Sequence, residues 1–360
     1  MPYASATWKI DALHIPRRIW IAGLAGAAVL ALYLDNASWL APAPGGTPGV
    51  LAHRGVHQTF RSEGLALDGC TASRIDPPTN PYLENTIPSI RASFAVGATA
   101  LELDVHPTAD GEFAVFHDWT LECRTNGHGV TRDQSMAYLK TLDIGYGYTA
   151  DGGRTFPFRG KGVGLMPTLH EVLSAFPDRQ FVINIKSNDA DEGDLLAGYL
   201  EAHGDPVDHR LWVYAADRPI GRLERRAPQA LLMSKKRGQA CAFGYVALGW
   251  SGYIPQACRG GVIGVPVNWR WLYWGWPNRF LARMHGANVE VMLLGAVERG
   301  AFRSAGTSGS TGVSRFSDLD AVPDGFPGMI LTDEIERIGP EVRRRFGARR
   351  HAMPSDSSMP

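Results

Sequence analysis

The sequence predicts a single (β/α)₈ barrel that follows an N-terminal hydrophobic helix. The chain has 360 residues, of which 44% are apolar, so it can bury one large core. From residue 49 onward, short β-branched or apolar runs alternate with helical stretches, as expected for βα units. Ionisable residues fall at the ends of several of these runs, where barrels of this class carry their active sites.

The N-terminal segment has the pattern of a membrane anchor or a signal peptide. Arg17 and Arg18 precede the uncharged run Ile19–Leu34, which is short for a span of roughly 20 residues. A positive flank on the N-terminal side predicts that the rest of the chain is exported. We therefore expect residues 1–41 to be a signal anchor or a cleaved signal peptide, with the catalytic domain on the extracytoplasmic (periplasmic) side. A Pro/Gly-rich linker follows at residues 42–48.

Eight runs have the composition of barrel strands, and eight parallel strands close a barrel. A ninth run, Phe113–His117, follows Asp110-Gly111, which is a hairpin signal. We expect this run to extend the second strand as a β-hairpin rather than to enter the barrel. Helices such as Thr168–Phe176 and Asp194–His203 lie between the strands. The eight runs are Val50–His53, Ala100–Val105, Phe181–Lys186, Leu211–Ala215, Leu231–Ser234, Val262–Pro266, Val289–Leu293 and Met329–Thr332.

The charge balance argues against nucleic acid as the main partner. Lys and Arg together number 36, as do Asp and Glu, whereas binding of a phosphate backbone needs clustered positive charge. Arginines concentrate only near the C-terminal end. We expect the barrel domain to cover residues 49–340 and a basic, disordered tail to cover residues 341–360. Contact of this tail with an acidic lipid surface is the alternative.

The four cysteines show no CxxC pair and no histidine at zinc-finger spacing, so a structural zinc site is not expected. In an oxidising compartment we expect two disulfides, Cys241–Cys258 and Cys70–Cys123. The shorter of these loops would contribute on the order of 3 kcal/mol. Four free buried thiols are the alternative.

Two carboxylates on the second strand predict a metal site. Glu102 and Asp104 stand two residues apart, so their side chains point to the same face, about 6.6 Å apart along the strand. Two carboxylates that converge inside a barrel do not both stay ionised cheaply without a cation. One hard divalent cation, Ca²⁺ or Mg²⁺, would satisfy both with oxygen ligands. The alternative is one exposed acid and one acid in a salt bridge.

Two histidines at the ends of strand runs predict acid–base chemistry. Phosphodiester cleavage needs a base for the attacking hydroxyl and an acid for the leaving alkoxide, and imidazole suits both tasks. A lone histidine is more often a satisfied core residue, but His53 and His117 each stand beside a charged residue. Arg54 and Lys186 can bind phosphate oxygens, the first as a bidentate fork and the second as a point charge.

An unusually aromatic loop, Asn268–Trp276, follows the sixth strand run. Exposed at the rim near a membrane anchor, it would hold an acyl chain or lie in the membrane interface. Ordinary loop packing is the alternative. We include Trp269 from this loop, and Lys235 at the end of the fifth run, among the candidate substrate-binding residues.

Several short motifs occur in an order that resembles the glycerophosphodiester phosphodiesterase family. Each motif is weak by itself, but the ordered set is specific and covers roughly residues 49–340. The motifs are Ala52-His53-Arg54-Gly55, Glu84-Asn85-Thr86, Glu102-Leu103-Asp104-Val105, Thr108-x-Asp110-Gly111, His117-Asp118-x-Thr120-Leu121, Arg124-Thr125-x-Gly127-x-Gly129, Pro167-Thr168-Leu169-x-Glu171, Ile183-Asn184-Ile185-Lys186 and Leu331-Thr332-Asp333.

The resemblance implies a function and a role for each matching residue. It implies a divalent metal held by Glu102 and Asp104, acid–base catalysis by His53 and His117, and a place for Glu84 near the metal or the phosphate. The implied reaction is hydrolysis of a small-molecule or lipid-derived glycerophosphodiester to sn-glycerol 3-phosphate and an alcohol.

One position departs from the family pattern. The family usually carries Glu, its third metal ligand, where this chain has Asn184. An asparagine still offers a carbonyl oxygen, but the site loses one negative charge and should bind metal more weakly. Asp189, Asp191 and Asp194 follow the strand and are candidates to supply the missing carboxylate.

Two alternatives stay open. A lysophospholipase-D-like or sphingomyelinase-D-like phosphodiesterase would place the same catalytic groups on this barrel and act on a lipid, which the N-terminal segment and the aromatic loop favour. The stretch Thr-Asn-Gly-His-Gly at 125–129 favours the glycerol enzyme. A non-catalytic phosphate-binding module is supported only by Asn184.

Overall fold

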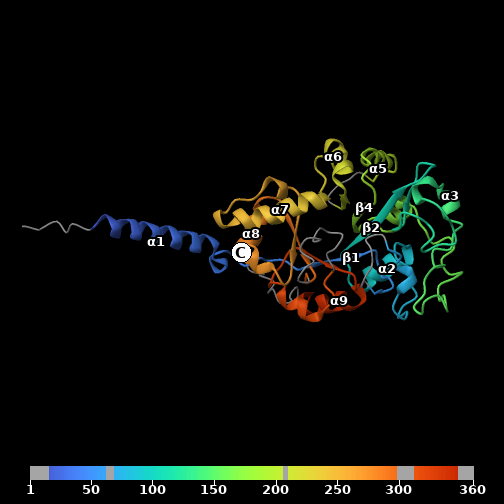
Figure 1. Ribbon diagram of the computed structural model, residues 1–360, viewed down its shortest axis with the longest axis horizontal. Coiled ribbons are helices and arrows are strands. Elements are labelled where there is room, and N and C mark those ends of the chain that lie inside the picture. Colours follow the sequence, from blue (N-terminus) through green and yellow to red (C-terminus); the bar gives the residue numbers. More distant parts are fainter. Residues whose placement is uncertain (1–15, 62–68, 206–209, 298–311, 348–360) are drawn as a thin grey trace, which may run out of the picture.

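The computed structural model describes residues 16–61, 69–205, 210–297 and 312–347 and confirms the predicted barrel class. Eight parallel strands follow one another in the order β6-β5-β4-β2-β1-β9-β8-β7, with helices around them (Figure 1). The strands are β1 (Gly49–His53), β2 (Ala100–Pro107), β3 (Phe113–Val115), β4 (Gln180–Ile185), β5 (Leu211–Ala215), β6 (Leu232–Ser234), β7 (Val262–Pro266), β8 (Glu290–Leu294) and β9 (Met329–Thr332). The α-helices are α1 (Arg17–Asn36), α2 (Ile87–Val96), α3 (Met136–Leu139), α4 (Leu169–Ala175), α5 (Asp191–Ala202), α6 (Asp217–Arg226), α7 (Lys235–Leu248), α8 (Asn278–Gly286) and α9 (Ile335–Val342).

The barrel is nearly closed rather than fully closed. Hydrogen-bonded ladders join all neighbouring strands along the order above, but none joins β6 to β7 within the described residues. The reason lies in β6, which is short and runs directly into α7. Ser234 ends the strand and caps the helix, since its Oγ accepts a hydrogen bond from the Arg237 backbone N–H at 3.2 Å. The closed cylinder expected from the sequence is therefore open along this seam.

The predicted hairpin is confirmed. β3 pairs antiparallel with the end of β2, with Val105 opposite Val115. The Phe116 N–H continues the pairing and donates to the Asp104 carbonyl at 3.0 Å. This hydrogen bond brings the residue that follows, His117, back beside the end of β2.

A second, smaller core lies beside the barrel, in the long segments between β1 and α2 and between β3 and α4. Its buried side chains include Leu121, Leu142 and Phe158. The Cys70–Cys123 disulfide joins the two segments, with a Cα–Cα distance of 5.4 Å. The other predicted disulfide, Cys241–Cys258, is also present and ties α7 to the loop before β7. Both predicted pairings are confirmed.

Helix α1 projects away from the barrel (Figure 1). Hydrogen bonds join its C-terminal end to the barrel. Among the described helices it is the one with the length and composition to cross a membrane. Arg283 on α8 donates to the Asp35 carboxylate at 2.6 Å and to Asn36 Oδ1 at 3.0 Å. Asn36 Nδ2 in turn donates to the Trp250 carbonyl at 2.7 Å. Residues 1–15 of the predicted anchor lie outside the described residues.

Helical structure continues beyond residue 340, where the barrel domain was expected to end. A π-helical turn, Arg343–Gly347, follows α9 directly. Glu341 accepts hydrogen bonds from Arg344 and Arg345, and Phe346 is buried. The expectation of a disordered tail from residue 341 is therefore wrong for residues 341–347, which these contacts hold in a helical turn. Residues 348–360 lie outside the described residues.

Candidate active site

The candidate catalytic residues converge at the C-terminal ends of adjacent strands. In the strand register His53 of β1 stands beside Glu102 of β2, and Asp104 of β2 stands beside Asn184 of β4. Asp333 follows β9, which pairs with the other edge of β1. Because the carboxyl ends of parallel strands meet at one end of a barrel, these side chains share one site.

His53 forms the first of two Asp–His pairs. Its Nδ1 lies 2.6 Å from Asp333 Oδ1, and its Nε2 lies 3.8 Å from Glu102 Oε2. Burial and the charge of Arg54 lower the pKa of His53, but Glu102 and Asp333 outweigh them, so the pKa lies above its usual value. Burial raises the pKa of Asp333, yet the hydrogen bond with His53 leaves it far below its usual range.

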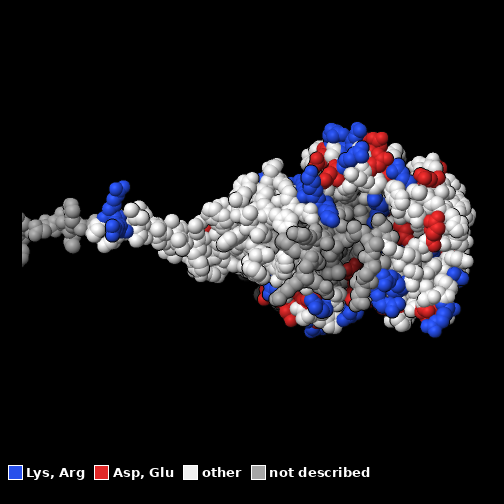
Figure 2. Space-filling view, in the orientation of Figure 1, with Lys and Arg blue, Asp and Glu red and all other residues white. Residues whose placement is uncertain are grey.

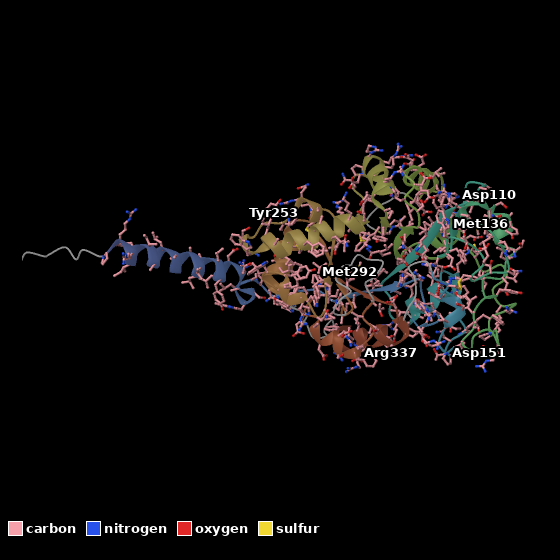
Figure 3. All side chains as sticks on the ribbon, in the orientation of Figure 1. Asp110, Met136, Asp151, Tyr253, Met292 and Arg337 are labelled. Atoms are coloured by element: carbon pink, nitrogen blue, oxygen red, sulfur yellow. A yellow bond between two sulfur atoms is a disulfide. The ribbon has the colours of Figure 1, made fainter. Side chains whose placement is uncertain are left out.

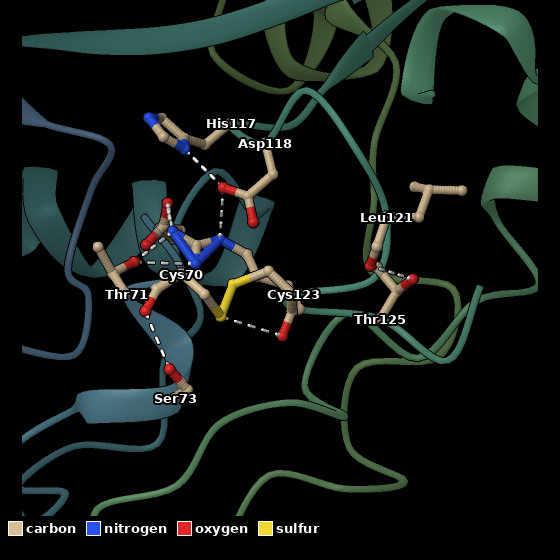
Figure 4. The surroundings of a disulfide bond; sticks show 10 residues. Cys70, Thr71, Ser73, His117, Asp118, Leu121, Cys123 and Thr125 are labelled. Atoms are coloured by element: carbon tan, nitrogen blue, oxygen red, sulfur yellow. Dashed lines mark hydrogen bonds and ion pairs between the residues drawn. A yellow bond between two sulfur atoms is a disulfide. The ribbon is translucent and has the colours of Figure 1, made fainter. Parts of the chain in front are cut away.

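His117 forms the second pair, with Asp118. Its Nδ1 lies 2.6 Å from Asp118 Oδ1, and Figure 4 shows this contact close to the Cys70–Cys123 disulfide. Burial and the charge of Arg54 lower the pKa of His117 to about 4, against the opposing effects of Asp104 and Asp118. In both pairs a carboxylate binds Nδ1, which leaves Nε2 for other partners; Nε2 of His53 accepts a hydrogen bond from Arg54 Nε at 3.2 Å.

The two carboxylates of β2 are buried but differ in their partners. Asp104 is fully buried and accepts hydrogen bonds from Lys186 Nζ at 3.0 Å and Asn85 Nδ2 at 3.1 Å. It also forms an ion pair with Arg54, whose Nε lies 3.1 Å from Oδ2. Burial raises the pKa of Asp104, but Lys186 and Arg54 hold it well below its usual value. Burial and the neighbouring charge of Asp104 raise the pKa of Glu102.

The side-chain oxygen atoms of Glu102, Asp104 and Asn184 are of the kind that bind a hard cation. Glu102 Oε2 is buried and has no hydrogen-bond partner within the described residues. Asn184 Nδ2 donates to Glu102 Oε1 at 2.8 Å and to Asp104 Oδ1 at 3.1 Å, and a flip of the amide would present its carbonyl oxygen instead. The described part of the chain contains no cluster of three His, Cys, Asp or Glu side chains that could hold a metal. Glu102 and Asp104, with Asn184 in the flipped orientation, would instead offer a cation two carboxylates and one amide oxygen.

The three aspartates proposed to replace the missing carboxylate lie elsewhere. Asp189 accepts from Arg132 Nη2 at 3.2 Å, and Asp191 and Asp194 form ion pairs with Arg222 of α6. Asp191 and Asp194 thus link α5 to α6, and Asp189, just before α5, pairs with Arg132, so all three carboxylates pair with arginines away from the carboxylates of β2.

A buried ionic network supports both histidines. Glu84 Oε1 accepts from Arg54 Nη1 at 3.2 Å and from Arg124 Nη2 at 3.1 Å, and Arg124 Nε lies 3.5 Å from Asp118 Oδ1. Burial raises the pKa of Glu84, but Arg124 and Arg54 outweigh it and lower the pKa to about 2. Arg54 has a φ of 60° and precedes Gly55, where a Cβ would lie 2.1 Å from the Ser89 hydroxyl. This left-handed turn aims the Arg54 side chain at Asp104 and Glu84.

Sequence reasoning underrated or missed four members of the site. Asp118 and Asp333 were seen only as parts of motifs, and Arg124 and Asn85 were given no role. Asn85 has a φ of 58° and exchanges two hydrogen bonds with Asp104, one from its amide and one to its carbonyl oxygen. The signal available in the sequence was that all four lie in the motifs that resemble the family.

Two predicted substrate-binding residues lie outside this cluster. Lys235 and Trp269 line a separate, mostly apolar cavity between β6, α7 and β7. Lys235 begins α7 instead of ending a strand, because β6 stops at Ser234.

Comparisons with known proteins match part of the chain by sequence and most of it by fold. Residues 53–210 match the model of the Glycerophosphoryl diester phosphodiesterase family. The matched segment runs from the end of β1 to the residue before β5, and over this segment the chain resembles the family. The glycerophosphodiester phosphodiesterase of Caldanaerobacter subterraneus subsp. tengcongensis is 36% identical over 103 residues, 29% of this chain and 39% of that protein. The human lysophospholipase D is 32% identical over 142 residues, 38% of this chain and 40% of that protein. The chain thus spans about two fifths of the length of the curated relatives it matches.

Solved structures of the family share the fold over most of the chain. The glycerophosphoryl diester phosphodiesterase domain of an uncharacterized Mycobacterium tuberculosis protein has a TM-score of 0.56 at 16% identity and covers 81% of this chain and 98% of its own. A glycerophosphodiester phosphodiesterase from Agrobacterium tumefaciens has a TM-score of 0.51 at 18% identity, with the same coverage of 81% and 98%. At this level of identity the likeness establishes the barrel fold.

Proposed function

We propose that this protein hydrolyses glycerophosphodiesters to sn-glycerol 3-phosphate and an alcohol. The observation that carries the proposal is the pair of Asp–His dyads, His53–Asp333 and His117–Asp118, at the end of β2 that holds the two carboxylates. One imidazole accepts the proton of the attacking hydroxyl, and the other gives a proton to the leaving oxygen. The Asp partners fix the ring orientation and tautomer and leave each Nε2 as the atom that exchanges a proton with the ester; at His53 the ester would displace the hydrogen bond from Arg54 Nε.

A divalent cation, Ca²⁺ or Mg²⁺, would be held by Glu102, Asp104 and the amide oxygen of Asn184. When bound, such a cation neutralises charge on the phosphoryl oxygens and orients the ester. The unpartnered Oε2 of Glu102 supports this assignment. With two carboxylates in place of three, the affinity for the cation should be lower than with a glutamate at position 184.

Arg54 and Lys186 supply positive charge for the phosphate. Both cations are half-buried and contact Asp104, one on each carboxylate oxygen. A cation bound between the carboxylates would compete for Asp104 and free these side chains for the phosphate oxygens. Arg54 offers the planar fork that suits two phosphate oxygens, and Lys186 a mobile point charge.

We further propose that α1 anchors the barrel to a membrane, with the barrel on the extracytoplasmic side. The helix has 20 residues, which span about 30 Å, and its two arginines stand at the N-terminal end. Two disulfides in the barrel support an oxidising compartment. This setting favours a second candidate substrate, a lysophospholipid, which agrees with the activity for which the human relative is named.

The test is a substrate panel on the full-length protein, assayed with chelator and with Ca²⁺ or Mg²⁺ restored. We expect release of sn-glycerol 3-phosphate from glycerophosphocholine that depends on the cation and falls by about 10²-fold or more in His53→Gln and in His117→Gln. A wild-type protein that binds the ester but turns over neither glycerophosphocholine nor lysophosphatidylcholine with any cation would instead be a phosphate-binding module.

A further inference from the structure

The open seam of the barrel leads to an apolar cavity that the proposed chemistry does not use. The cavity has a volume of about 140 Å³ and lies between β6, α7, β7 and β8. Its walls are mostly apolar, with Met233, Ala242, Met292 and Leu294 among them. Polar residues also line it: Ser234, Lys235, Arg237 and Gln239. Met292 lies in the middle of the barrel (Figure 3). A cavity of this size and polarity matches one known to hold a benzene ring in another protein, so it can take about six carbon atoms.

The cavity and the ionic site are two halves of one barrel interior. Asp104, Asn184, Tyr214 and Met233 stand in register on β2, β4, β5 and β6. Residues in register on parallel strands point to the same face. The row therefore begins with the carboxylate of Asp104, in the ionic site, and ends with the apolar side chain of Met233, in the cavity. Strands lie about 4.8 Å apart, which places Met233 no more than about 14 Å from Asp104. One molecule with a charged head and an apolar chain can reach both halves.

The cavity also lies near the C-terminal end of α1, the proposed membrane helix. The aromatic segment after β7 lines it with Trp269, Leu272 and Tyr273. Tyr273 also lines a second groove, whose other walls include Tyr33 of α1 and Trp250.

Trp271 and Trp274, which line this groove, have exposed side chains, and so does Tyr253 outside it. Trp271 is 73% exposed, Tyr253 50% and Trp274 42%. Figure 3 shows Tyr253 on the side of the barrel that faces α1, and Figure 2 shows that α1 and the adjoining barrel surface carry few charged residues beyond the two arginines at the helix start. Tryptophan and tyrosine concentrate at membrane–water interfaces, so this end of the barrel suits contact with the bilayer that α1 enters.

We propose that the cavity binds the acyl chain of a single-chain phospholipid that enters from the bilayer past the aromatic groove. The inference rests on the proposed function, since it names the substrate class of the same site. The glycerophosphodiester head lies over Asp104 and Asn184, and the first carbons of the chain fill the space between Met233 and Leu294. The apolar walls select a lysophospholipid over its deacylated counterpart.

The test compares two tryptophan substitutions on α7 in full-length protein reconstituted in lipid nanodiscs. Ala242 lines the cavity, so Ala242→Trp fills it; Ala247 is exposed on the same helix and lies outside the cavity, so Ala247→Trp is the matched control. We measure kcat/KM for lysophosphatidylcholine and for glycerophosphocholine. We divide the value for lysophosphatidylcholine by the value for glycerophosphocholine. Because Ala242→Trp removes the apolar subsite, this ratio should fall by about tenfold or more, while Ala247→Trp should keep the wild-type ratio.

Three results separate this inference from the proposed function. If the wild type hydrolyses glycerophosphocholine but not lysophosphatidylcholine, the acyl-chain site is wrong, whereas the proposed diesterase function still holds. An unchanged ratio in Ala242→Trp overturns the acyl-chain site as well. If neither ester is hydrolysed, the diesterase fails, and native mass spectrometry with lysophosphatidylcholine then decides on the cavity: retention of the lipid by wild type and not by Ala242→Trp supports it, and equal retention overturns it.

Discussion

Replacing Glu84 by glutamine should destabilise the barrel by removing the shared partner of two buried guanidinium groups. Glu84 is 8% exposed and contacts both Arg54 and Arg124. Because its pKa falls from 4.5 to about 2 on folding, the charge contributes on the order of 3 kcal/mol at pH 7. Breaking a buried ion pair by removing one partner costs about 3–5 kcal/mol. We expect Glu84→Gln to lose an amount in this range.

The same carboxylate predicts how this loss depends on pH. A folded-state pKa below the unfolded value gives stability that is present above pH 4.5 and lost as the pH falls through 2. Between pH 7 and pH 3.5 the contribution should shrink by about 1.4 kcal/mol. The gap in unfolding free energy between wild type and Glu84→Gln should narrow by that amount.

The assay is denaturant unfolding of the full-length protein in detergent, followed by tryptophan fluorescence at both pH values. Glu224→Gln is the control, because Glu224 forms an exposed ion pair with Arg237 at 2.8 Å, and such pairs contribute about 0–1 kcal/mol. If Glu84→Gln is no less stable than Glu224→Gln, or if the gap does not change with pH, the reasoning about this network is wrong.

Three further predictions concern the site. Asp118→Asn should lower kcat by about 10²-fold or more with little change in KM, because His117 loses the carboxylate that orients its ring; steady-state kinetics checks this. Cys70→Ser together with Cys123→Ser should lower thermal stability by about 4 kcal/mol in the loop-entropy account, measured by calorimetry. Asn184→Glu should tighten binding of Ca²⁺ or Mg²⁺ in titration calorimetry, and no gain would mean that this side chain does not touch the cation.

The second disulfide, Cys241–Cys258, provides a control for the prediction about Cys70–Cys123. Thr71 and Arg124 follow the two cysteines, and both Arg124 Nη atoms donate to the Thr71 hydroxyl at 2.8 and 3.1 Å (Figure 4). Loss of this disulfide should therefore lower activity as well as stability. Cys241→Ser with Cys258→Ser, on the far side of the barrel, should lower stability by about 3 kcal/mol and spare the turnover of glycerophosphocholine. Equal losses of activity in both double variants would argue against the link through Arg124.

Local patterns in the chain determined the barrel and its hairpin. The Asp110-Gly111 turn and the alternation of apolar runs predicted β3 and the eight parallel strands, because turn chemistry and side-chain period depend on neighbours in sequence. The same patterns predicted that Glu102 and Asp104 share a face, since a strand alternates its side chains.

Only the tertiary structure decided which distant groups meet. Asp333 reaches His53 because β9 pairs with β1, and a contact across 280 residues leaves no local pattern. The sequence by itself also offered Asp189 as a ligand, but packing of α5 directs it to Arg132. The apolar cavity exists because a short β6 leaves the barrel seam unpaired, and strand length depends on the packing of the whole sheet more than on the residues of one strand.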